Sequence, residues 1–410
     1  MNRESLRIVI VGHVDHGKST LIGRLFYDTG SLPPEKMREI ERISEDLGHD
    51  TELAFLMDHL QEERDQGITI DTAQTFFKTA TRDYVIIDAP GHRQFLKNMI
   101  TGASQAEAAL LVVDAEEGVR EQTRRHAYLL SLLGLRQLVV AVNKMDTVEF
   151  SESRFREVTE ELAAFLSGIA SASTYMVPIS ARRGDNVARR SQDLPWYEGP
   201  TILEALDRFQ PVEPQLRPFR FPVQGIYPRD GTEIVAGRVE SGMVRSGDEL
   251  LVLPSGVRTT VTGVHEFLAT PTVLEPGQSG GITVSIAKPA RGDMLVALEN
   301  PPTARTSIPA TVFWMSRQPL SLTEPLTFRC TTQEVPCRVA RIRRRLDSST
   351  LTVIDEDADT LADTEVAELE LETGRPVVVE EHAFLPELGR FVLERGYDVV
   401  AGGIVTSLPA

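Results

Sequence analysis

The sequence predicts an α/β domain with a mostly parallel sheet, followed by two antiparallel β-barrel domains. In the first half of the chain, short apolar strands alternate with segments of helical period, as in sheets that are covered by helices. The proline-rich stretch PVEPQLRP, residues 211–218, then breaks this pattern. Beyond it, short β-rich pieces are separated by glycine turns, which is typical of small barrels. The predicted division is a first domain at 1–210, a linker at 211–217, and barrels at 218–304 and 305–410.

The elements of the first domain follow from its hydrophobic periodicity. Apolar runs predict strands at residues 6–12, 71–77, 83–89, 108–114, 137–143 and 174–180. Apolar residues spaced three and four apart predict helices at 19–28, 122–134 and 153–168. One connection, residues 29–69, is far longer than the others. A connection of that length in a compact domain is usually functional, often a mobile element over a site.

Composition narrows the class of protein. With 41% apolar and 25% charged residues, the chain is typical of a soluble globular protein. It does not open with a signal peptide, and its apolar runs are shorter than the ~18 residues of a membrane span, so we expect a cytoplasmic protein without a membrane partner. The two cysteines, Cys330 and Cys337, match neither a metal pair nor a redox pair, which agrees with a reducing compartment.

The net charge of −17 bears on possible partners. Proteins that bind nucleic acid mainly through its phosphates usually carry a basic excess or a basic face. We therefore do not expect nucleic acid as a partner. One basic cluster occurs, RVARIRRRLD at 338–347. Its arginines partly alternate with apolar residues, and we favour a solvated strand face over a docking patch.

The motif GHVDHGKS matches the phosphate-binding pattern G-x-x-x-x-G-K-[ST], after a predicted strand and at the start of a predicted helix. Its backbone N–H groups would surround the phosphates, Lys18 would reach the β and γ phosphates, and Ser19 would bind Mg²⁺. Asp15 is a candidate ligand for a monovalent cation or for a water on Mg²⁺. The residues predicted to line the nucleotide here are Gly12, His13, Val14, Asp15, His16, Gly17, Lys18, Ser19 and Thr20.

A second motif, DAPGH, begins at Asp88 where another predicted strand ends. Asp88 would hold Mg²⁺ through a water, and the Gly91 N–H would donate to the γ-phosphate. Thr69, in GITI at the end of the long connection, would complete the Mg²⁺ shell and order that connection only when a third phosphate is present. The residues of this motif predicted to lie at the nucleotide are Asp88, Ala89, Pro90, Gly91 and His92.

The motif NKMD, which follows the fifth predicted strand, predicts the base. The Asp146 carboxylate can accept hydrogen bonds from the ring N–H and exocyclic amine of guanine, a donor pair that adenine lacks. Asn143 belongs to the same loop, and Lys144 can lie along the base. A backbone contact to the guanine oxygen is predicted from Ser180, Ala181 and Arg182. In this order the motifs predict a GTP site, and the first domain is therefore predicted to be an α/β P-loop GTPase domain.

His92 is the predicted catalytic residue. Hydrolysis needs a water held in line with the γ-phosphate, and Gly91 places the next side chain there. Val14 and Ile68 flank this path and could form an apolar gate for the water.

The motifs GHVDHGKST, GITI, DAPGH and NKMD together resemble the translational GTPases of the elongation factor Tu and 1A type. This resemblance implies a G domain with two β-barrels over essentially the whole chain. Several shorter stretches of the sequence resemble the large, GTPase subunit of bacterial sulfate adenylyltransferase. They include QTRRH, where translation factors usually carry glutamate in place of Arg125, and WMSRQPL at 314–320.

Two functions are consistent with these resemblances. The first is a GTPase subunit that couples GTP hydrolysis to the formation of adenylyl sulfate and pyrophosphate from ATP and sulfate. Its partner in a heterodimer would be a small ATP-pyrophosphatase-type catalytic subunit, because SGGITVS at 279–285 lacks the aspartate of an adenylyl-transferring loop. The alternative is a GTP-switched carrier of aminoacyl-tRNA. Arg125 and WMSRQPL favour the first function, which we expect, whereas the HVDH interior of the phosphate loop favours the second.

Overall fold

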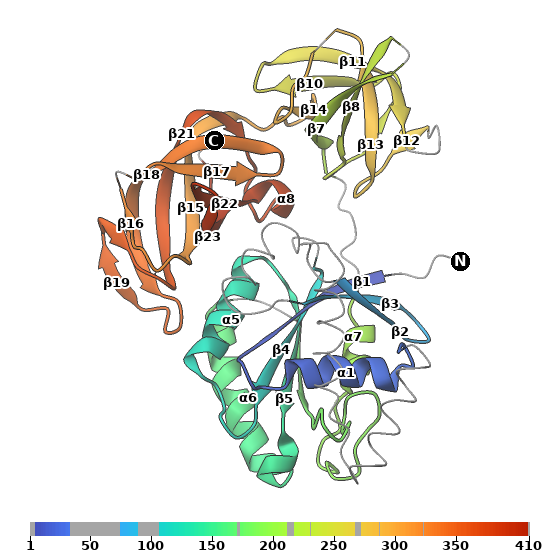
Figure 1. Ribbon diagram of the computed structural model, residues 1–410, viewed down its shortest axis with the longest axis vertical. Helices are drawn as coiled ribbons and strands as arrows, with labels where there is room; N and C mark the ends of the chain where they lie inside the picture. The colour runs from blue at the N-terminus through green and yellow to red at the C-terminus, as the bar shows by residue number, and fades with distance from the viewer. Residues whose placement is uncertain are drawn as a thin grey trace. The chain divides into compact units, whose positions relative to one another are not determined.

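A computed structural model describes residues 5–32, 74–88, 106–169, 173–210, 217–229, 231–266, 272–286, 288–322 and 324–408. The chain divides into two compact units, Met1–Val212 and Glu213–Ala410 (Figure 1). In the described ranges, no helix has the length and apolar character that crossing a bilayer requires.

The first unit contains a six-stranded sheet in the order β2-β3-β1-β4-β5-β6. Its strands are β1 (Ser5–Gly12), β2 (Gln74–Lys78), β3 (Asp83–Asp88), β4 (Ala108–Asp114), β5 (Gln137–Asn143) and β6 (Ser173–Pro178). All pairings are parallel except that of β2 with β3. Every residue of β4 is buried, as expected for a central strand covered on both faces. The predicted mostly parallel sheet is confirmed.

Helices flank this sheet (Figure 1). They are α1 (Lys18–Asp28), α5 (Glu121–Leu132), α6 (Glu152–Ser167) and α7 (Ile202–Asp207), with a 3₁₀ turn η1 (Met145–Val148) after β5. The sequence gives two of them a clear start. The Ser151 hydroxyl accepts from the Arg154 N–H at the start of α6, and Thr201 forms a capping box with Glu204 at the start of α7.

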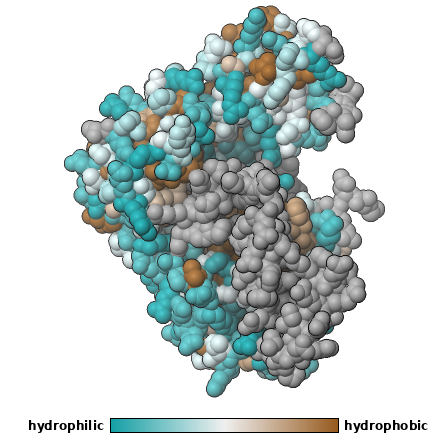
Figure 2. All heavy atoms as spheres, viewed as in Figure 1, coloured by the Kyte–Doolittle hydropathy of each residue, from teal (hydrophilic) through white to brown (hydrophobic). Residues whose placement is uncertain are grey.

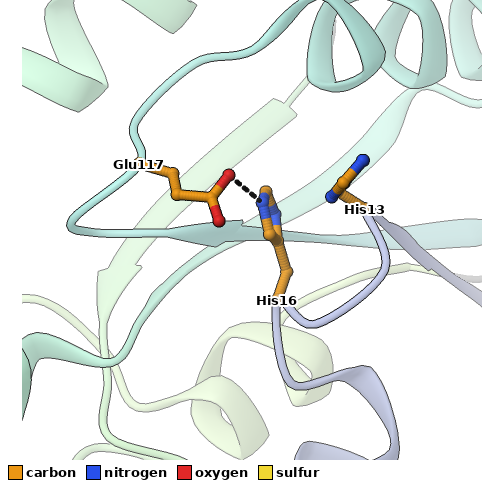
Figure 3. A group of neighbouring side chains, drawn as sticks. All are labelled: His13, His16 and Glu117. Carbon is orange, nitrogen blue, oxygen red and sulfur yellow. Dashed lines mark ion pairs between the residues drawn. The ribbon is translucent and has the colours of Figure 1, made fainter.

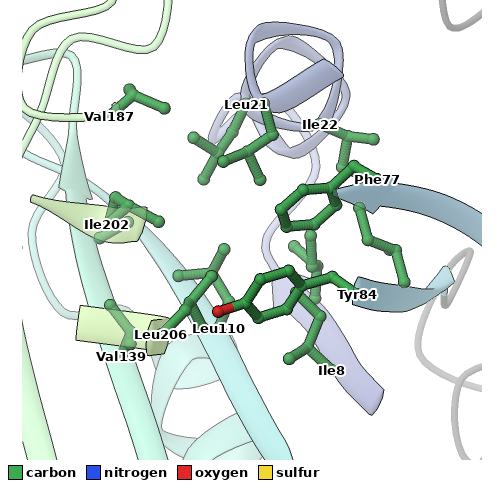
Figure 4. Packing of buried hydrophobic residues seen from close by; sticks show 14 of the residues in the cluster. Ile8, Leu21, Ile22, Phe77, Tyr84, Leu110, Val139, Val187, Ile202 and Leu206 are labelled. Carbon is green, nitrogen blue, oxygen red and sulfur yellow. The ribbon is translucent and has the colours of Figure 1, made fainter. Parts of the chain in front are cut away.

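One core cluster of this unit lies where α1 and α7 pack on the sheet. Figure 4 shows Leu21 and Ile22 of α1 with strand residues such as Ile8 and Leu110. Ile202 and Leu206 of α7 complete the same cluster. This packing orients α1 so that its N-terminus lies at the carboxyl ends of the parallel strands, where open α/β sheets bind ligands. The predicted connection over 29–69 lies mostly outside the described residues.

The second unit begins with a closed barrel in the order β10-β11-β13-β8-β7-β14. The strands of this region are β7 (Arg220–Arg229), β8 (Thr232–Arg238), β9 (Val244–Arg245), β10 (Glu249–Leu253), β11 (Val257–His265), β12 (Val273–Leu274), β13 (Ser279–Val284) and β14 (Met294–Ala297). The SGGITVS segment forms β13, which pairs with β8 and β11. It is therefore a strand of the barrel wall.

The rest of this unit is a seven-stranded sheet in the order β17-β22-β23-β15-β21-β18-β19. The strands of this sheet are β15 (Ala304–Trp314), β17 (Leu326–Cys330), β18 (Gln333–Asp347), β19 (Val353–Glu356), β21 (Glu365–Val378), β22 (Arg390–Arg395) and β23 (Asp398–Val405). Strands β16 (Leu320–Ser321) and β20 (Thr360–Leu361) form a separate two-stranded sheet, and helix α8 (Pro386–Gly389) precedes β22. Because β17 also pairs with β18, the sheet returns on itself as a barrel. The predicted fold class, with barrels after the α/β domain, is confirmed.

The arginine cluster lies on β18, where buried and exposed residues largely alternate. Its arginines pair with acidic residues: Arg338 with Glu372, Arg341 with Asp357, Arg343 with Glu370, Arg344 with Glu368 and Arg345 with Glu365. This arrangement agrees with the solvated strand face favoured from the sequence.

Candidate functional site

The phosphate loop runs from the end of β1 to the start of α1, and close backbone approaches explain its glycines. A Cβ on Gly12 would lie 2.6 Å from the Val112 oxygen, and one on Gly17 would lie 2.4 Å from Asn143 Nδ2. Gly17 also has φ +88°, which an L side chain rarely adopts. As the N-cap of α1 it offers no side-chain acceptor. The first N–H groups of α1 therefore remain available to an anion, as a phosphate site requires.

Lys18 crosses this loop. Its ammonium donates to the main-chain oxygens of Gly12, at 2.8 Å, and His13, at 2.7 Å. Two short hydrogen bonds hold the positive charge at the mouth of the loop, beside the helix N-terminus. Both charges favour the same ligand, an anion with several oxygens. Ser19, in the first turn of α1, is exposed, so its hydroxyl is accessible to a metal ion.

Asn143 joins the phosphate loop to the loop after β6. Its Nδ2 donates to the His16 oxygen at 2.8 Å, and its Oδ1 accepts from the Ala181 N–H at 2.9 Å. Asn143 and Ala181 are both buried. Because the Ala181 N–H is used in this way, the predicted contact from this segment to a guanine oxygen would share that donor or come from a neighbouring group.

Lys144 contacts a residue that the sequence did not single out. Its Nζ lies 2.7 Å from Oδ2 of Asp114, the last residue of β4. Burial alone would raise the pKa of Asp114, but hydrogen bonds from Lys144 and from the N–H groups of Glu117 and Glu116 together lower it. Asp114 thus stays ionised and holds the ammonium of Lys144, the lysine of the NKMD loop, at the end of β4. The sequence signal that could have identified Asp114 is an acidic residue at the end of a central strand.

Asp146 lies on η1 and is half-exposed. Nearby, the Arg183 guanidinium stacks over the Phe150 ring at 4.9 Å, and Trp196 Nε1 donates to the Phe150 oxygen at 3.0 Å. Sequence reasoning missed this aromatic support of the base loop, because its members are distant in the chain. It orders the segment directly after Asp146.

His16 is the other residue whose setting was not anticipated. Its side chain is fully buried, although the motif suggested only a residue lining the nucleotide. Burial lowers its pKa, and contacts to Val112, Asp114 and Glu117 oppose this only in part. The ring is therefore held neutral inside the loop.

Several predicted site residues lie outside the described residues. They are Thr69, Ala89, Pro90, Gly91 and His92, together with Ile68 of the suggested gate. Asp88 is described as the last residue of β3. The catalytic role of His92 and the ligand roles of Thr69 and Asp88 therefore stay predictions. The described part of the site brings together Lys18, Asn143, Lys144 and Asp146.

Comparison with known proteins decides the family. The elongation factor Tu GTP binding domain matches residues 3–212, and elongation factor Tu domain 2 matches residues 233–295. The GTP-eEF1A C-terminal domain-like family matches residues 307–406. The chain belongs to the elongation factor Tu family of GTPases. GTP and Mg²⁺ are accordingly its ligands, and the loop geometry above fits them.

Individual relatives extend over almost the whole chain. Elongation factor 1-alpha of Methanopyrus kandleri is 39% identical over 427 residues, covering 99% of this chain and 98% of that protein. Elongation factor 1-alpha of Methanococcus vannielii is 41% identical over 415 residues, covering 97% and 96%. A crystal structure of Sup35 complexed with GDP is 28% identical, with a TM-score of 0.46, and covers 100% of this chain and 95% of that one.

These relatives overturn the sulfate adenylyltransferase prediction. Homologues that match nearly the full length are named elongation factor 1-alpha, so both the adenylyl sulfate function and the small ATP-pyrophosphatase-type partner are wrong. The same relatives contradict the expectation that nucleic acid is not a partner. Net charge sums over the whole surface, whereas recognition of a nucleic acid depends on the local field.

The structure explains why the stretches QTRRH and WMSRQPL led to a wrong prediction of function. Arg125 forms an ion pair with Glu121 one turn earlier on α5. The outer face over α5 and α6 is mainly hydrophilic (Figure 2), and Arg124 pairs there with Glu161. In WMSRQPL, Trp314 and Leu320 are buried in the core of the last barrel. These residues serve local pairing and packing, which different functions within one family can share.

Proposed function

We propose that this chain is a GTP-dependent translation factor of the elongation factor 1-alpha type, which carries aminoacyl-tRNA to the ribosome. The observation that carries the proposal is identity of about 40% to elongation factor 1-alpha along 97% of the chain. The similarity includes both regions beyond the G domain, where a carrier would hold its cargo. Work at the ribosome also implies a cytoplasmic location.

In the proposed site, guanine is recognised by the NKMD loop. Asp146 accepts from the ring N–H and the exocyclic amine, and Lys144, held by Asp114, lies along the base. Asn143 keeps this loop in register with the phosphate loop. Binding of the base and binding of the phosphates are thereby coupled through one buried side chain.

At the other end of the nucleotide, Lys18 and the N-terminus of α1 bind the β and γ phosphates. Ser19, Thr69 and Asp88 (through a water) would hold Mg²⁺, which neutralises charge that develops on the phosphate oxygens. His92 orients a water so that its oxygen attacks the γ phosphorus while the bond to GDP breaks. The products are GDP and inorganic phosphate. Loss of the γ-phosphate removes the reason for Thr69 to stay in place, which would switch affinity for the cargo.

Protection of the aminoacyl ester tests this function. The chain with a non-hydrolysable GTP analogue should slow spontaneous deacylation of aminoacyl-tRNA, whereas the GDP form should protect it far less. Uncharged tRNA added in excess is the matched competitor, because it presents the same phosphates without the ester. GTP turnover by the chain bound to aminoacyl-tRNA should rise when ribosomes with the cognate codon are present. Equal protection by the GDP and analogue forms, with no effect of ribosomes, would refute the proposal.

A further inference from the structure

Three side chains of the types that bind metal ions lie close together between the phosphate loop and the loop after β4. They are His13, His16 and Glu117, and their candidate ligand atoms all lie within 4.8 Å of one another. Figure 3 shows the two imidazoles on the loop after β1 and the carboxylate on the loop after β4. Predicted nucleotide binding uses the backbone of this loop and leaves these side chains without a function.

The tautomers of both histidines suit a metal. His13 Nδ1 lies 2.8 Å from the Val14 oxygen, and His16 Nδ1 lies 3.3 Å from the Val112 oxygen. A carbonyl oxygen only accepts, so each Nδ1 carries the proton and each Nε2 keeps its lone pair. A metal-ligating histidine usually donates its other ring N–H to just such a partner.

His16 Nε2 supplies an independent observation. The side chain is fully buried, and this nitrogen has no hydrogen-bond partner among the described residues. A buried polar atom of this kind normally has one, and its absence needs an explanation. The nearest acidic oxygen, Glu117 Oε2, is 3.5 Å away, which is long for a hydrogen bond.

The distance of 3.5 Å between His16 Nε2 and Glu117 Oε2 is instead the distance expected between two ligands of one metal ion. Two ligands at about 2.0–2.1 Å from a tetrahedral Zn²⁺ lie roughly 3.4 Å apart. Histidine nitrogens and one carboxylate oxygen form a set that zinc accepts, with a fourth position for water. Arg120 Nε lies 3.7 Å from Glu117 Oε2, but its side chain is 59% exposed and can turn into solvent.

We propose that His13, His16 and Glu117 form a binding site for a zinc-class divalent transition metal between the phosphate loop and the loop after β4. The site differs in ligand chemistry from the Mg²⁺ site, which uses oxygen atoms and the nucleotide. It does not depend on what the GTPase carries. Because its histidines belong to residues 12–19, a bound ion would tie the phosphate loop to the loop after β4.

The test is a zinc titration of the full chain with GDP and excess Mg²⁺, which keeps the oxygen site filled. We expect one Zn²⁺ per chain, and a visible Co²⁺ spectrum of tetrahedral type. Glu117→Gln should weaken zinc binding at least about tenfold, because it removes a charged ligand. Glu116→Gln, the adjacent exposed carboxylate, is the matched control and should bind zinc as the parent does.

His13→Ala is the second variant, chosen because His13 is only partly buried and its loss leaves no core cavity. It should also weaken zinc binding at least about tenfold. Circular dichroism of each variant checks that the fold is retained. Absence of stoichiometric zinc binding, or equal zinc affinity in the parent, Glu117→Gln and His13→Ala, would overturn the proposal.

Discussion

The Asn143 side chain donates to the main-chain oxygen of His16 at 2.8 Å, across 127 positions of the chain. The same side chain accepts from Ala181, so one buried amide holds the phosphate loop against the two loops that surround the predicted base site. The local geometry of the nucleotide site therefore depends on a residue that was expected only to belong to a base motif.

Asn143→Ala should weaken GTP and GDP to a similar extent. The change leaves the His16 oxygen and the Ala181 N–H without their partner, and each unsatisfied buried group costs about 1–3 kcal/mol. We expect at least a tenfold loss of affinity for both nucleotides, which corresponds to about 1.4 kcal/mol. Fluorescent-nucleotide titration measures it. Glu149→Gln, an exposed residue directly after the same loop, is the control. Loss of GTP binding alone would contradict the anchoring role.

Asp146→Asn should exchange guanine for xanthine specificity. The amide places a donor where the carboxylate accepted, so GTP should bind at least about tenfold more weakly and xanthosine triphosphate more tightly. Competition titrations with both nucleotides measure the exchange. Glu149→Gln removes a nearby exposed charge and should leave both affinities as they are. If Asp146→Asn bound GTP as the parent does, the base assignment would fail.

His92→Ala should slow hydrolysis and leave GTP affinity nearly intact. A positioned acid–base side chain contributes about 10²–10⁴-fold to rate, and His92 is predicted to contact the water and not the phosphates. Single-turnover hydrolysis of bound GTP, measured with ribosomes, gives the rate. His265→Ala, in the second unit, serves as the histidine control. Weak GTP binding with normal turnover of the bound fraction would rule out this role.

Glu240 should make the second unit less stable as pH rises. Burial, opposed by Arg238 and reinforced by Glu387, raises the pKa of Glu240 to about 7. Because this lies above the ordinary value of 4.5, the folded state binds the proton more tightly than the unfolded state. Stability is therefore lost between about pH 4.5 and pH 7 and stays lower above that range.

Glu240→Gln should remove this effect. At pH 8 the variant should be more stable than the parent by on the order of 3 kcal/mol, and at pH 4.5 the two should be nearly equal. Urea unfolding at both pH values measures the difference. Glu233→Gln, exposed on β8, is the matched control. An equal gain at both pH values would show that packing, and not ionisation, is responsible.

Local patterns were sufficient for the elements of the fold. The apolar runs of the first unit form β-strands within a few residues of the predicted bounds, because a buried strand needs a continuous apolar segment. The phosphate loop was also predictable, since glycine at residue 17 is required by its own backbone angle. The function was not. Arg125 and Trp314 influenced that prediction, yet in the structure they make an ion pair and a core contact.

By itself, the sequence determined a GTP-binding α/β domain and two β-rich domains, because those depend on periodicity and short motifs. The tertiary structure decided which strands and side chains lie next to each other. Pairing of β1 with β4 brings Gly12 opposite Val112, and so sets His16 near Glu117. The periodicity of the sequence does not predict which strands become neighbours, because strand order depends on the packing of the whole sheet. Contacts such as Lys144 with Asp114 therefore emerge only when the strands are assembled.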